Sequence, residues 1–200
     1  NAAVVGYCAS NQIDLVVVGP EAPLVAGLAD ALLDANISCF GPSKAAAQLE
    51  GSKSFTRSFA ASCGIPSPVS KTFTSSVEAI AWFDEQRFEV VVKADGLAAG
   101  KGVIIPENRE ETVQAITSMI DGRELGVSGS TIVLEERMTG EELSLFGVSD
   151  GSTVLALATA QDHKRVGEGD TGPNTGGMGA FSPVPGIDAS RQAELASLFL

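Results

Sequence analysis

A glycine-rich segment flanked by lysines is the part of the sequence best suited to chemistry on an anion. Its ten residues, KADGLAAGKG, begin at Lys93 and include Gly96, Gly100, Lys101 and Gly102. Closely spaced glycines let backbone N–H groups converge on a phosphate, and lysines add positive charge. The segment is neither a Walker A motif nor a GxGxxG turn before a helix. It predicts a phosphate-covering loop, and a glycine-rich hairpin that binds nothing is the alternative.

An acidic stretch lies further along the chain. Four carboxylates occur between Val133 and Glu142, in the sequence VLEERMTGEE. In a nucleotide-binding protein, such a stretch can link two lobes: its backbone meets adenine while a carboxylate accepts hydrogen bonds from the ribose. A solvated acidic hinge has the same composition, so the residues alone leave both interpretations open.

The single histidine belongs to a cationic cluster with the sequence QDHKR. The grouping of His163, Lys164 and Arg165 in an acidic protein suggests anion binding, although a surface charge run is the alternative. The segment DTGPNTGGMGA, residues 170–180, then offers backbone donors and small polar groups. No Ser or Cys adjoins His163 in the sequence. We therefore expect these segments to bind and position substrates, without a protein nucleophile.

The pattern of apolar residues predicts the elements that position these segments. The apolar run Ile13 to Val18 predicts a strand buried on both faces, as in a parallel sheet. A helix beginning near Pro23 and a strand from Ser38 to Phe40 complete a βαβ unit. A boundary near Gly51 separates this unit from a mixed α+β region.

A small self-contained lobe is predicted from Val69 to Leu134, with the element order β-α-β-β-α-β. Its two helices, and the helix that precedes the lobe, begin after residues suited to capping, Ser75, Asn108 and Ser52. We therefore expect a sheet whose strands carry the glycine-rich and acidic segments at their ends.

The last part of the sequence has a different pattern. Apolar segments on both sides of Asp150-Gly151 predict a hairpin. Residues 160–182 are dense in Gly, Pro, Asn and Thr, and we expect a long loop without regular structure, which is either functional or disordered.

Composition excludes several classes of protein. The 200 residues carry a formal net charge of −12, which argues against a nucleic-acid partner. No apolar stretch is long enough to span a membrane, and no signal peptide is apparent. The three cysteines, at wide spacing, predict buried free thiols in a reducing cytoplasm, with neither a disulfide framework nor a zinc site.

These segments, in this order, resemble the glycinamide ribonucleotide synthetases (phosphoribosylamine–glycine ligases) of the ATP-grasp superfamily. The resemblance rests on VVGPEAPL at residues 17–24, QLEGSK at 48–53, the glycine-rich segment, and QDHKR followed by DTGPNTGGMGA. The last of these motifs is highly specific to that family. The resemblance extends over essentially all 200 residues.

The resemblance implies a role for each matching residue. ATP-binding roles fall on Lys53, Lys93, Gly96, Gly100, Lys101, Gly102, Glu135, Glu136, Met138 and Glu142. Within this set, the two lysines at 53 and 93 contact phosphates, residues 135–138 form the adenine-facing hinge, and Glu142 meets the ribose. Roles on the substrate side fall on Glu21, Asp162, Lys164, Arg165, Asn174, Thr175, Gly176 and Gly177. The catalytic roles fall on Lys93 and Arg165.

The resemblance also implies a fold and a domain arrangement. The expected class is α/β and α+β, an ATP-grasp fold preceded by part of a Rossmann-like pre-ATP-grasp domain. Residues 1–51 would end that first domain and residues 52–200 would begin the ATP-grasp domain, with a small lobe at 69–138 and the large lobe from 139.

The implied reaction joins glycine to 5-phosphoribosylamine, with ATP and Mg²⁺ or Mn²⁺, through glycyl phosphate in de novo purine synthesis. We expect the chain to be a fragment cut at both ends, inactive alone, with its metal ligands beyond residue 200 and none within it. Another ATP-grasp carboxylate–amine ligase is one alternative, although it should lack DTGPNTGGMGA. A nucleotide-binding module without a reaction is the other.

Overall fold

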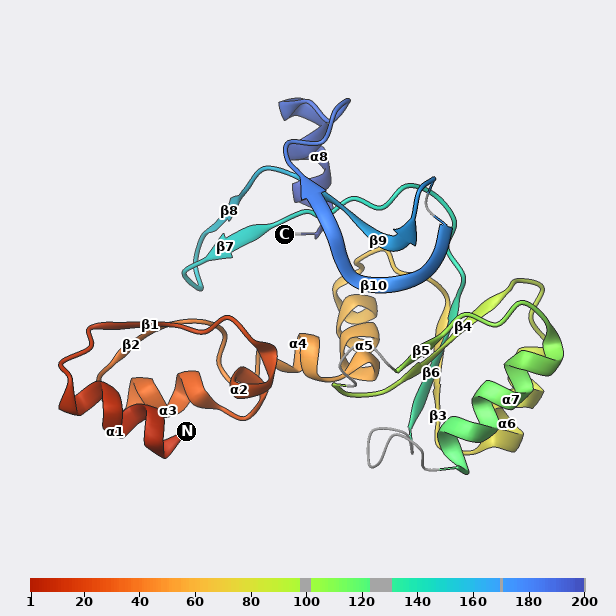
Figure 1. Cartoon of the computed structure of the whole chain (residues 1–200), viewed down its shortest axis with the longest axis horizontal. Coiled ribbons are helices and arrows are strands. Elements are labelled where there is room, and N and C mark those ends of the chain that lie inside the picture. Colours follow the sequence, from red (N-terminus) through yellow and green to blue (C-terminus); the bar gives the residue numbers. More distant parts are fainter. Residues whose placement is uncertain (98–101, 123–130, 170, 200) are drawn as a thin grey trace. The chain divides into compact units, whose positions relative to one another are not determined.

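The computed structural model of the chain describes residues 1–97, 102–122, 131–169 and 171–199 (Figure 1). The chain divides into two compact units, Asn1–Arg137 and Met138–Leu200. The first unit contains the elements from α1 to β6, and the second contains those from β7 to α8.

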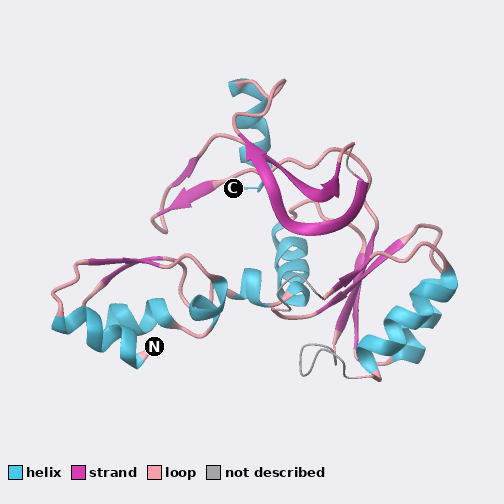
Figure 2. Ribbon diagram, in the orientation of Figure 1, coloured by secondary structure: helices cyan, strands magenta, loops and turns pink. Residues whose placement is uncertain are grey.

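The first unit begins with a small βαβ arrangement, as the sequence predicts. Its elements are α1 (Ala2–Ser10), β1 (Leu15–Val17), α2 (Glu21–Val25), α3 (Leu28–Asp34) and β2 (Ser38–Phe40). The strands β1 and β2 lie side by side (Figure 2). They are parallel, and Val16 pairs with Cys39. Cys8, Leu28, Leu32 and Ile37 form a core between the helices and one face of this pair, with Val16 packed against it.

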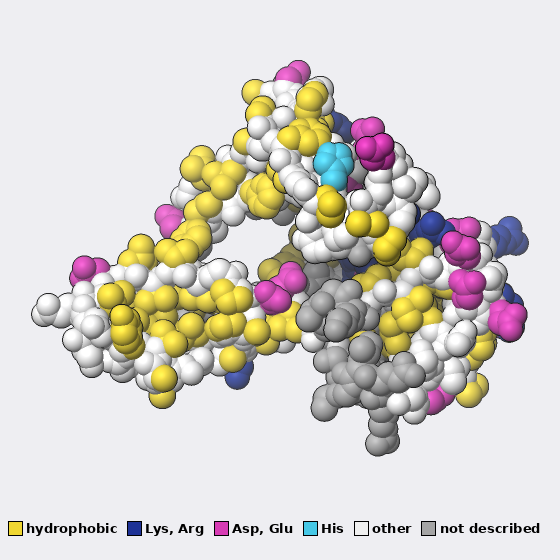
Figure 3. All heavy atoms as spheres, in the orientation of Figure 1, with side chains coloured by type: hydrophobic (Ala, Val, Ile, Leu, Met, Phe, Trp, Pro, Cys, Tyr) yellow, Lys and Arg dark blue, Asp and Glu magenta, His cyan; other side chains and the backbone are white. Residues whose placement is uncertain are grey.

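Three details of this region differ from the predictions. Helix α1 was not expected, because its small apolar residues follow no clear helical period. The predicted single helix is divided at Gly27, whose φ of 82° places it in the left-handed region. The strand β1 is not buried on both faces: Leu15 and Val17 are 55% and 66% exposed, because the described helices cover one face only. Figure 3 shows hydrophobic side chains gathered on the surface of this part.

The predicted lobe is confirmed in its element order. It contains β3 (Ser70–Phe73), α6 (Ser76–Asp84), β4 (Val90–Ala94), β5 (Val103–Ile104), α7 (Arg109–Ile120) and β6 (Ile132–Glu136). The four strands form one sheet in the order β3-β6-β4-β5, and every neighbouring pair is antiparallel. Two further helices, α4 (Gln48–Gly51) and α5 (Lys53–Cys63), precede the lobe.

The two faces of this sheet have different neighbours. Helices α6 and α7 cover one face, and α5 lies on the other side (Figure 1). The core under α6 and α7 contains ten buried residues: Phe73, Ala79, Val92, Ala94, Ala115, Ile116, Met119, Ile120, Ile132 and Leu134. The main apolar core of the lobe therefore lies away from α5.

The three predicted helix caps are confirmed. The Ser52 hydroxyl accepts a hydrogen bond from Phe55 N, Ser75 from Glu78 N, and Asn108 from Glu111 N. Each bond satisfies a backbone donor of the first helical turn that has no partner within the helix.

The second unit confirms one prediction and contradicts another. Strands β7 (Gly147–Ser149) and β8 (Val154–Ala156) form the predicted antiparallel hairpin. The expected structureless loop at 160–182 is wrong, because β9 (Gln161–Gly167) and β10 (Thr171–Phe181) pair antiparallel. Register shifts within β10, together with glycines of positive φ, let this glycine-rich segment form an irregular strand. Helix α8 (Ala189–Phe199) follows.

The prediction of three buried thiols is also wrong. All three cysteines are free, but only Cys8 is buried, whereas Cys39 is half-buried and Cys63 is exposed. Cys63 is the last residue of α5 and therefore lies at a helix end.

Asp95 joins the end of β4 to the start of α5. Its carboxylate accepts hydrogen bonds from the backbone N–H of Ser54 and Gly96, and from the hydroxyls of Ser52 and Ser54 at 3.2 and 2.7 Å. Burial raises the pKa of Asp95, but the hydrogen bonds lower this pKa by more than burial raises it, so it lies below its ordinary value. The carboxylate is therefore the ion that fixes the two elements together.

Replacing Asp95 with Asn should lower the free energy of unfolding by about 1–2 kcal/mol at pH 7. The pKa of Asp95 is lower in the folded state than in the unfolded state, where it is about 4. The carboxylate therefore stabilises the fold at pH values above the unfolded pKa, and this stabilisation is lost as the pH falls through the folded pKa. The difference between Asp95→Asn and the unsubstituted chain should therefore shrink below about pH 4 in urea unfolding curves. A difference in the free energy of unfolding that does not change with pH would contradict this expectation. Asp34→Asn, at an exposed position, serves as the control.

Replacing Val92 with Ala should lower the free energy of unfolding by about 1.5–3 kcal/mol, because its side chain is fully buried in the core beneath α6 and α7. The matched control is Val77→Ala in α6 of the same lobe, where the side chain is 76% exposed. Chemical unfolding measures both, and similar losses for the two variants would contradict the placement of the core.

Candidate functional site

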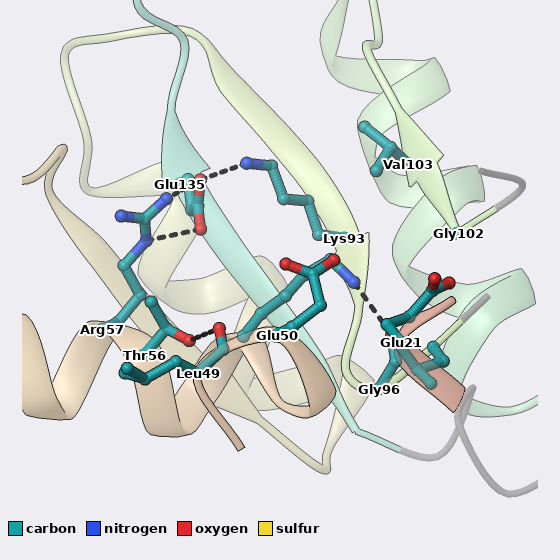
Figure 4. Close-up of a pocket in the computed structure, with 12 residues that line it drawn as sticks. Glu21, Leu49, Glu50, Thr56, Arg57, Lys93, Gly96, Gly102, Val103 and Glu135 are labelled. Atoms are coloured by element: carbon teal, nitrogen blue, oxygen red, sulfur yellow. Dashed lines mark hydrogen bonds and ion pairs between the residues drawn. The ribbon is translucent and has the colours of Figure 1, made fainter. Parts of the chain in front are cut away.

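A cavity of about 340 Å³ in the first unit holds many of the residues that the sequence singles out (Figure 4). Helices α2, α4 and α5, strands β4 and β6, and both described ends of the glycine-rich segment contribute to its wall. The lining residues are Glu21, Leu49, Glu50, Lys53, Thr56, Arg57, Lys93, Gly96, Leu97, Gly102, Val103 and Glu135.

Strand geometry places Lys93 and Glu135 in this cavity. Along β4, Val92 and its alternate neighbours are buried, and Lys93 is half-buried between them. In the antiparallel register Lys93 pairs with Val133 and Val91 with Glu135, so Lys93 and Glu135 project from the same face of the sheet. This face is opposite to the core under α6 and α7, and it can therefore carry charge.

The carboxylate of Glu135 contacts two cations. Arg57 Nε and Nη2 donate to its two oxygens at 2.7 and 3.0 Å, and Lys93 Nζ donates to Oε2. Burial raises the pKa of Glu135, but the hydrogen bonds and charges of Arg57 and Lys93 lower it by more than burial raises it. This pKa therefore lies below its ordinary value. Glu135 is therefore an anion at neutral pH although its side chain is only 3% exposed.

Lys53 lines the same cavity from the first turn of α5. Its Nζ donates a hydrogen bond to the carbonyl oxygen of Gly96 at 2.9 Å. Gly96 has a φ of 89°, a conformation that a residue with a Cβ rarely adopts. Lys53 thus contacts the backbone where the glycine-rich segment leaves β4.

The cavity brings together residues that the sequence assigned to ATP and one that it assigned to the substrate side. Lys53, Lys93, Gly96, Gly102 and Glu135, all assigned to ATP, line the cavity, and so does Glu21, assigned to the substrate side. The predicted positions Gly100 and Lys101 lie outside the described residues.

Two other predicted hinge residues, Glu136 and Met138, are not among the lining residues of this cavity. Glu136 Oε2 accepts a hydrogen bond from the backbone of Val69 at 3.4 Å, and Met138 is 68% exposed at the start of the second unit. Because the side chain of Glu135 is engaged with cations, the adenine-facing role stays a prediction that concerns the backbone of this stretch.

Sequence analysis missed Arg57 and Glu50. Arg57 lies four residues after Lys53 in α5, so both side chains share one helix face, and this spacing was an available signal. Glu50 lies in the short helix α4, and no spacing in the sequence links it to the strands across the cavity.

In the second unit, Lys164 links residues that the sequence assigned to different ligands. Its Nζ lies 3.2 Å from Glu142 Oε2 and 3.8 Å from Asp162 Oδ2. Thr175 Oγ1 donates to the carbonyl oxygen of Lys164 at 2.8 Å and accepts from Gly177 N at 3.1 Å. The pairing of β9 with β10 thus brings most of the predicted substrate-side residues together.

A shallow cavity of about 290 Å³ lies on the same hairpin. Arg165 and His163 line it with Met178 and residues 166–169. The backbone of Asn174 pairs with Arg165 across the hairpin, and the ring of His163 lies 5.7 Å from that of Phe181. The hairpin therefore presents a cation beside a concave surface.

No group of three or more His, Cys, Asp or Glu side chains suited to a metal ion occurs within residues 1–97, 102–122, 131–169 and 171–199.

Comparison with known proteins identifies the family. Residues 1–50 match the phosphoribosylglycinamide synthetase N domain, and residues 51–198 match the phosphoribosylglycinamide synthetase ATP-grasp (A) domain. The chain is 55% identical over 185 residues to a phosphoribosylamine–glycine ligase of Agrobacterium fabrum, covering 92% of this chain and 44% of the relative. A phosphoribosylamine–glycine ligase of Rhodopirellula baltica is 48% identical over 204 residues, covering 99% and 47%.

A solved structure supports the same relationship. The phosphoribosylamine–glycine ligase of Thermotoga maritima superposes with a TM-score of 0.74 at 36% sequence identity, covering 81% of this chain and 41% of that one. The chain spans less than half the length of these relatives. The resemblance and the fold class predicted from the sequence are confirmed, and the chain belongs to the phosphoribosylglycinamide synthetase family, with an ATP-grasp fold.

Proposed function

We propose that the protein carrying this chain joins glycine to 5-phosphoribosylamine, with ATP as the energy source, in de novo purine synthesis. The products are glycinamide ribonucleotide, ADP and phosphate. The observation that supports this proposal most directly is the cavity in which Lys53 and Lys93 lie beside both ends of a glycine-rich segment. The family match agrees with it.

The proposed chemistry needs no nucleophile from the protein. A carboxylate oxygen of glycine attacks the γ-phosphorus of ATP, and the bond from this phosphorus to the β–γ bridging oxygen breaks, giving glycyl phosphate and ADP. The amine of phosphoribosylamine then attacks the carbonyl carbon, and inorganic phosphate leaves as the nitrogen loses a proton. In both steps negative charge moves between oxygens, so fixed cations and backbone donors supply the catalysis.

In the first unit, Lys53 and Lys93 would bind the phosphates of ATP. Lys93 is held on a rigid strand and is only 24% exposed, so its charge acts in a partly water-excluded place. The backbone of residues 135–138 would face adenine, and Glu142 would meet the ribose. The glycine-rich segment would then cover the phosphates with its N–H groups.

The second unit would recognise the other substrates. Arg165 is the proposed contact for an anionic group, because it lies beside a concave surface of the β9–β10 hairpin. We also assign Asp162, Lys164 and the backbone around 174–177 to the substrate side, and Glu21 of the first unit to phosphoribosylamine.

Phosphoryl transfer of this kind uses a divalent cation, and we propose Mg²⁺ or Mn²⁺, which would neutralise charge on the phosphates. We assign no residue of this chain as its ligand and no step through it. We propose glycine and 5-phosphoribosylamine as small-molecule partners, with neither nucleic acid nor a membrane, and the cytoplasm as the location. No helix within the described residues has the length and apolar character to cross a membrane.

Lys93→Ala should raise the KM for ATP at least about tenfold or lower kcat comparably, because a phosphate contact and a fixed cation are lost. The test measures glycine-dependent and phosphoribosylamine-dependent ADP release by the full-length protein that carries this chain. Lys71→Ala is the matched control, an exposed lysine of the same sheet that does not belong to the cavity lining. Unchanged kinetics in Lys93→Ala would contradict the site, and absence of turnover in the unsubstituted protein would contradict the reaction.

Arg165→Ala should raise the KM for phosphoribosylamine or glycine about tenfold or more while leaving ATP binding within about twofold. We expect this separation because Arg165 is assigned to the substrate side and Lys93 to the phosphates of ATP. Calorimetric titration with ATP and steady-state kinetics give the two values. An equal loss of affinity for ATP and for the other substrates would argue against a separate substrate surface, and Arg191→Ala in α8 is the control.

A further inference from the structure

Arg57 has no role in the proposed reaction, yet its side chain lines the cavity and makes a two-bond contact with Glu135 there. Its guanidinium binds both oxygens of Glu135, and its side chain is 27% exposed, whereas that of Glu135 is 3% exposed. Two parallel N–H···O bonds of this kind fix both orientation and distance. Figure 4 shows Arg57 and Lys93 approaching Glu135 from α5 and β4.

The charges of these three groups determine what Lys93 can offer to a ligand. A buried carboxylate that contacts Lys93 alone would cancel the charge of that lysine. With Arg57 present, two cations share one anion, so the group Arg57–Glu135–Lys93 retains a net charge of +1. The lowered pKa of Glu135 keeps its carboxylate ionised, and this balance therefore holds at neutral pH.

The other charged residues of the cavity make its net charge sensitive to the loss of a single cation. Among its described lining residues, the carboxylates of Glu21, Glu50 and Glu135 are matched by the cations of Lys53, Arg57 and Lys93, so the formal charges cancel. Loss of one cation would leave the wall with a net negative charge facing an anionic ligand. In a partly buried site such a charge is weakly screened.

We propose that Arg57 is a positioning residue that neutralises and orients Glu135, so that Lys93 keeps its position and its positive charge for the phosphates of a nucleotide. The inference rests on the proposed function, since it takes Lys93 as a phosphate contact. Arg57 acts through Glu135, because its Nε and Nη2 are both engaged with that carboxylate.

The test compares four proteins: the unsubstituted full-length protein, Arg57→Gln, Glu135→Gln, and the double variant. The formal charge of the triad is +1, 0, +2 and +1 in that order. Arg57→Gln should weaken ATP binding about tenfold or more, with the larger effect on the KM for ATP and a smaller one on kcat. The double variant should recover most of this loss, because it restores the net charge without restoring the Arg57 contact.

Two control variants separate this role from a general effect on folding. Arg109→Gln removes a similar two-bond contact, between Arg109 and Asp84 at the surface, and should leave the KM for ATP within about twofold. Arg57→Lys keeps the charge and loses the two-bond geometry, so its KM for ATP should lie between those of the unsubstituted protein and Arg57→Gln. The KM for glycine should change less than about twofold in all variants.

Two results would overturn the inference: an ATP affinity of Arg57→Gln within twofold of the unsubstituted protein, or a double variant no better than Arg57→Gln. Equilibrium dialysis with ATP keeps this test separate from the reaction. If the unsubstituted protein binds ATP without ligating glycine, the proposed reaction fails, and the binding comparison still decides the role of Arg57. If it binds no ATP, the inference fails as well.

Discussion

The alternation of side chains along β4 and β6 is the constraint on which the candidate site depends. A strand places successive side chains on opposite faces, and here Val92 and Leu134 enter the core under α6 and α7. The intervening positions, Lys93 and Glu135, must then lie on the face toward α5. The lobe thus stabilises itself with one face of the sheet and presents charged groups with the other.

The cost of burying a carboxylate explains the arrangement on that second face. Glu135 is almost fully enclosed, and an unpaired charge there would strongly destabilise the fold. Two cations offset this cost, Arg57 from a helix and Lys93 from the neighbouring strand. The Asp95 network fixes the start of that helix to the end of β4, so the elements that carry Arg57, Lys53 and Lys93 are held together. The stability of this region and the proposed binding of ATP therefore depend on the same few contacts.

Local signals in the sequence predicted much of this fold, and long-range pairing limited the rest. The caps at Ser52, Ser75 and Asn108 act within one helical turn, so residue types were sufficient to find them. The β9–β10 hairpin was mistaken for a loop, because its glycine-rich composition hides a pairing that only a partner strand reveals. The sequence indicated Lys93 and Glu135 as candidates, but it could not indicate their contact or the bond from Arg57, which is 78 residues away from Glu135.

The central claim is that the phosphates of ATP bind in the cavity of the first unit. A crystal structure of the full-length protein with a non-hydrolysable ATP analogue tests it most directly. Phosphate oxygens should lie within hydrogen-bonding distance of Nζ of Lys53 and Lys93, with Arg57 still bound to both oxygens of Glu135. Phosphates bound away from this cavity, with Lys93 contacting Glu135 alone, would contradict it.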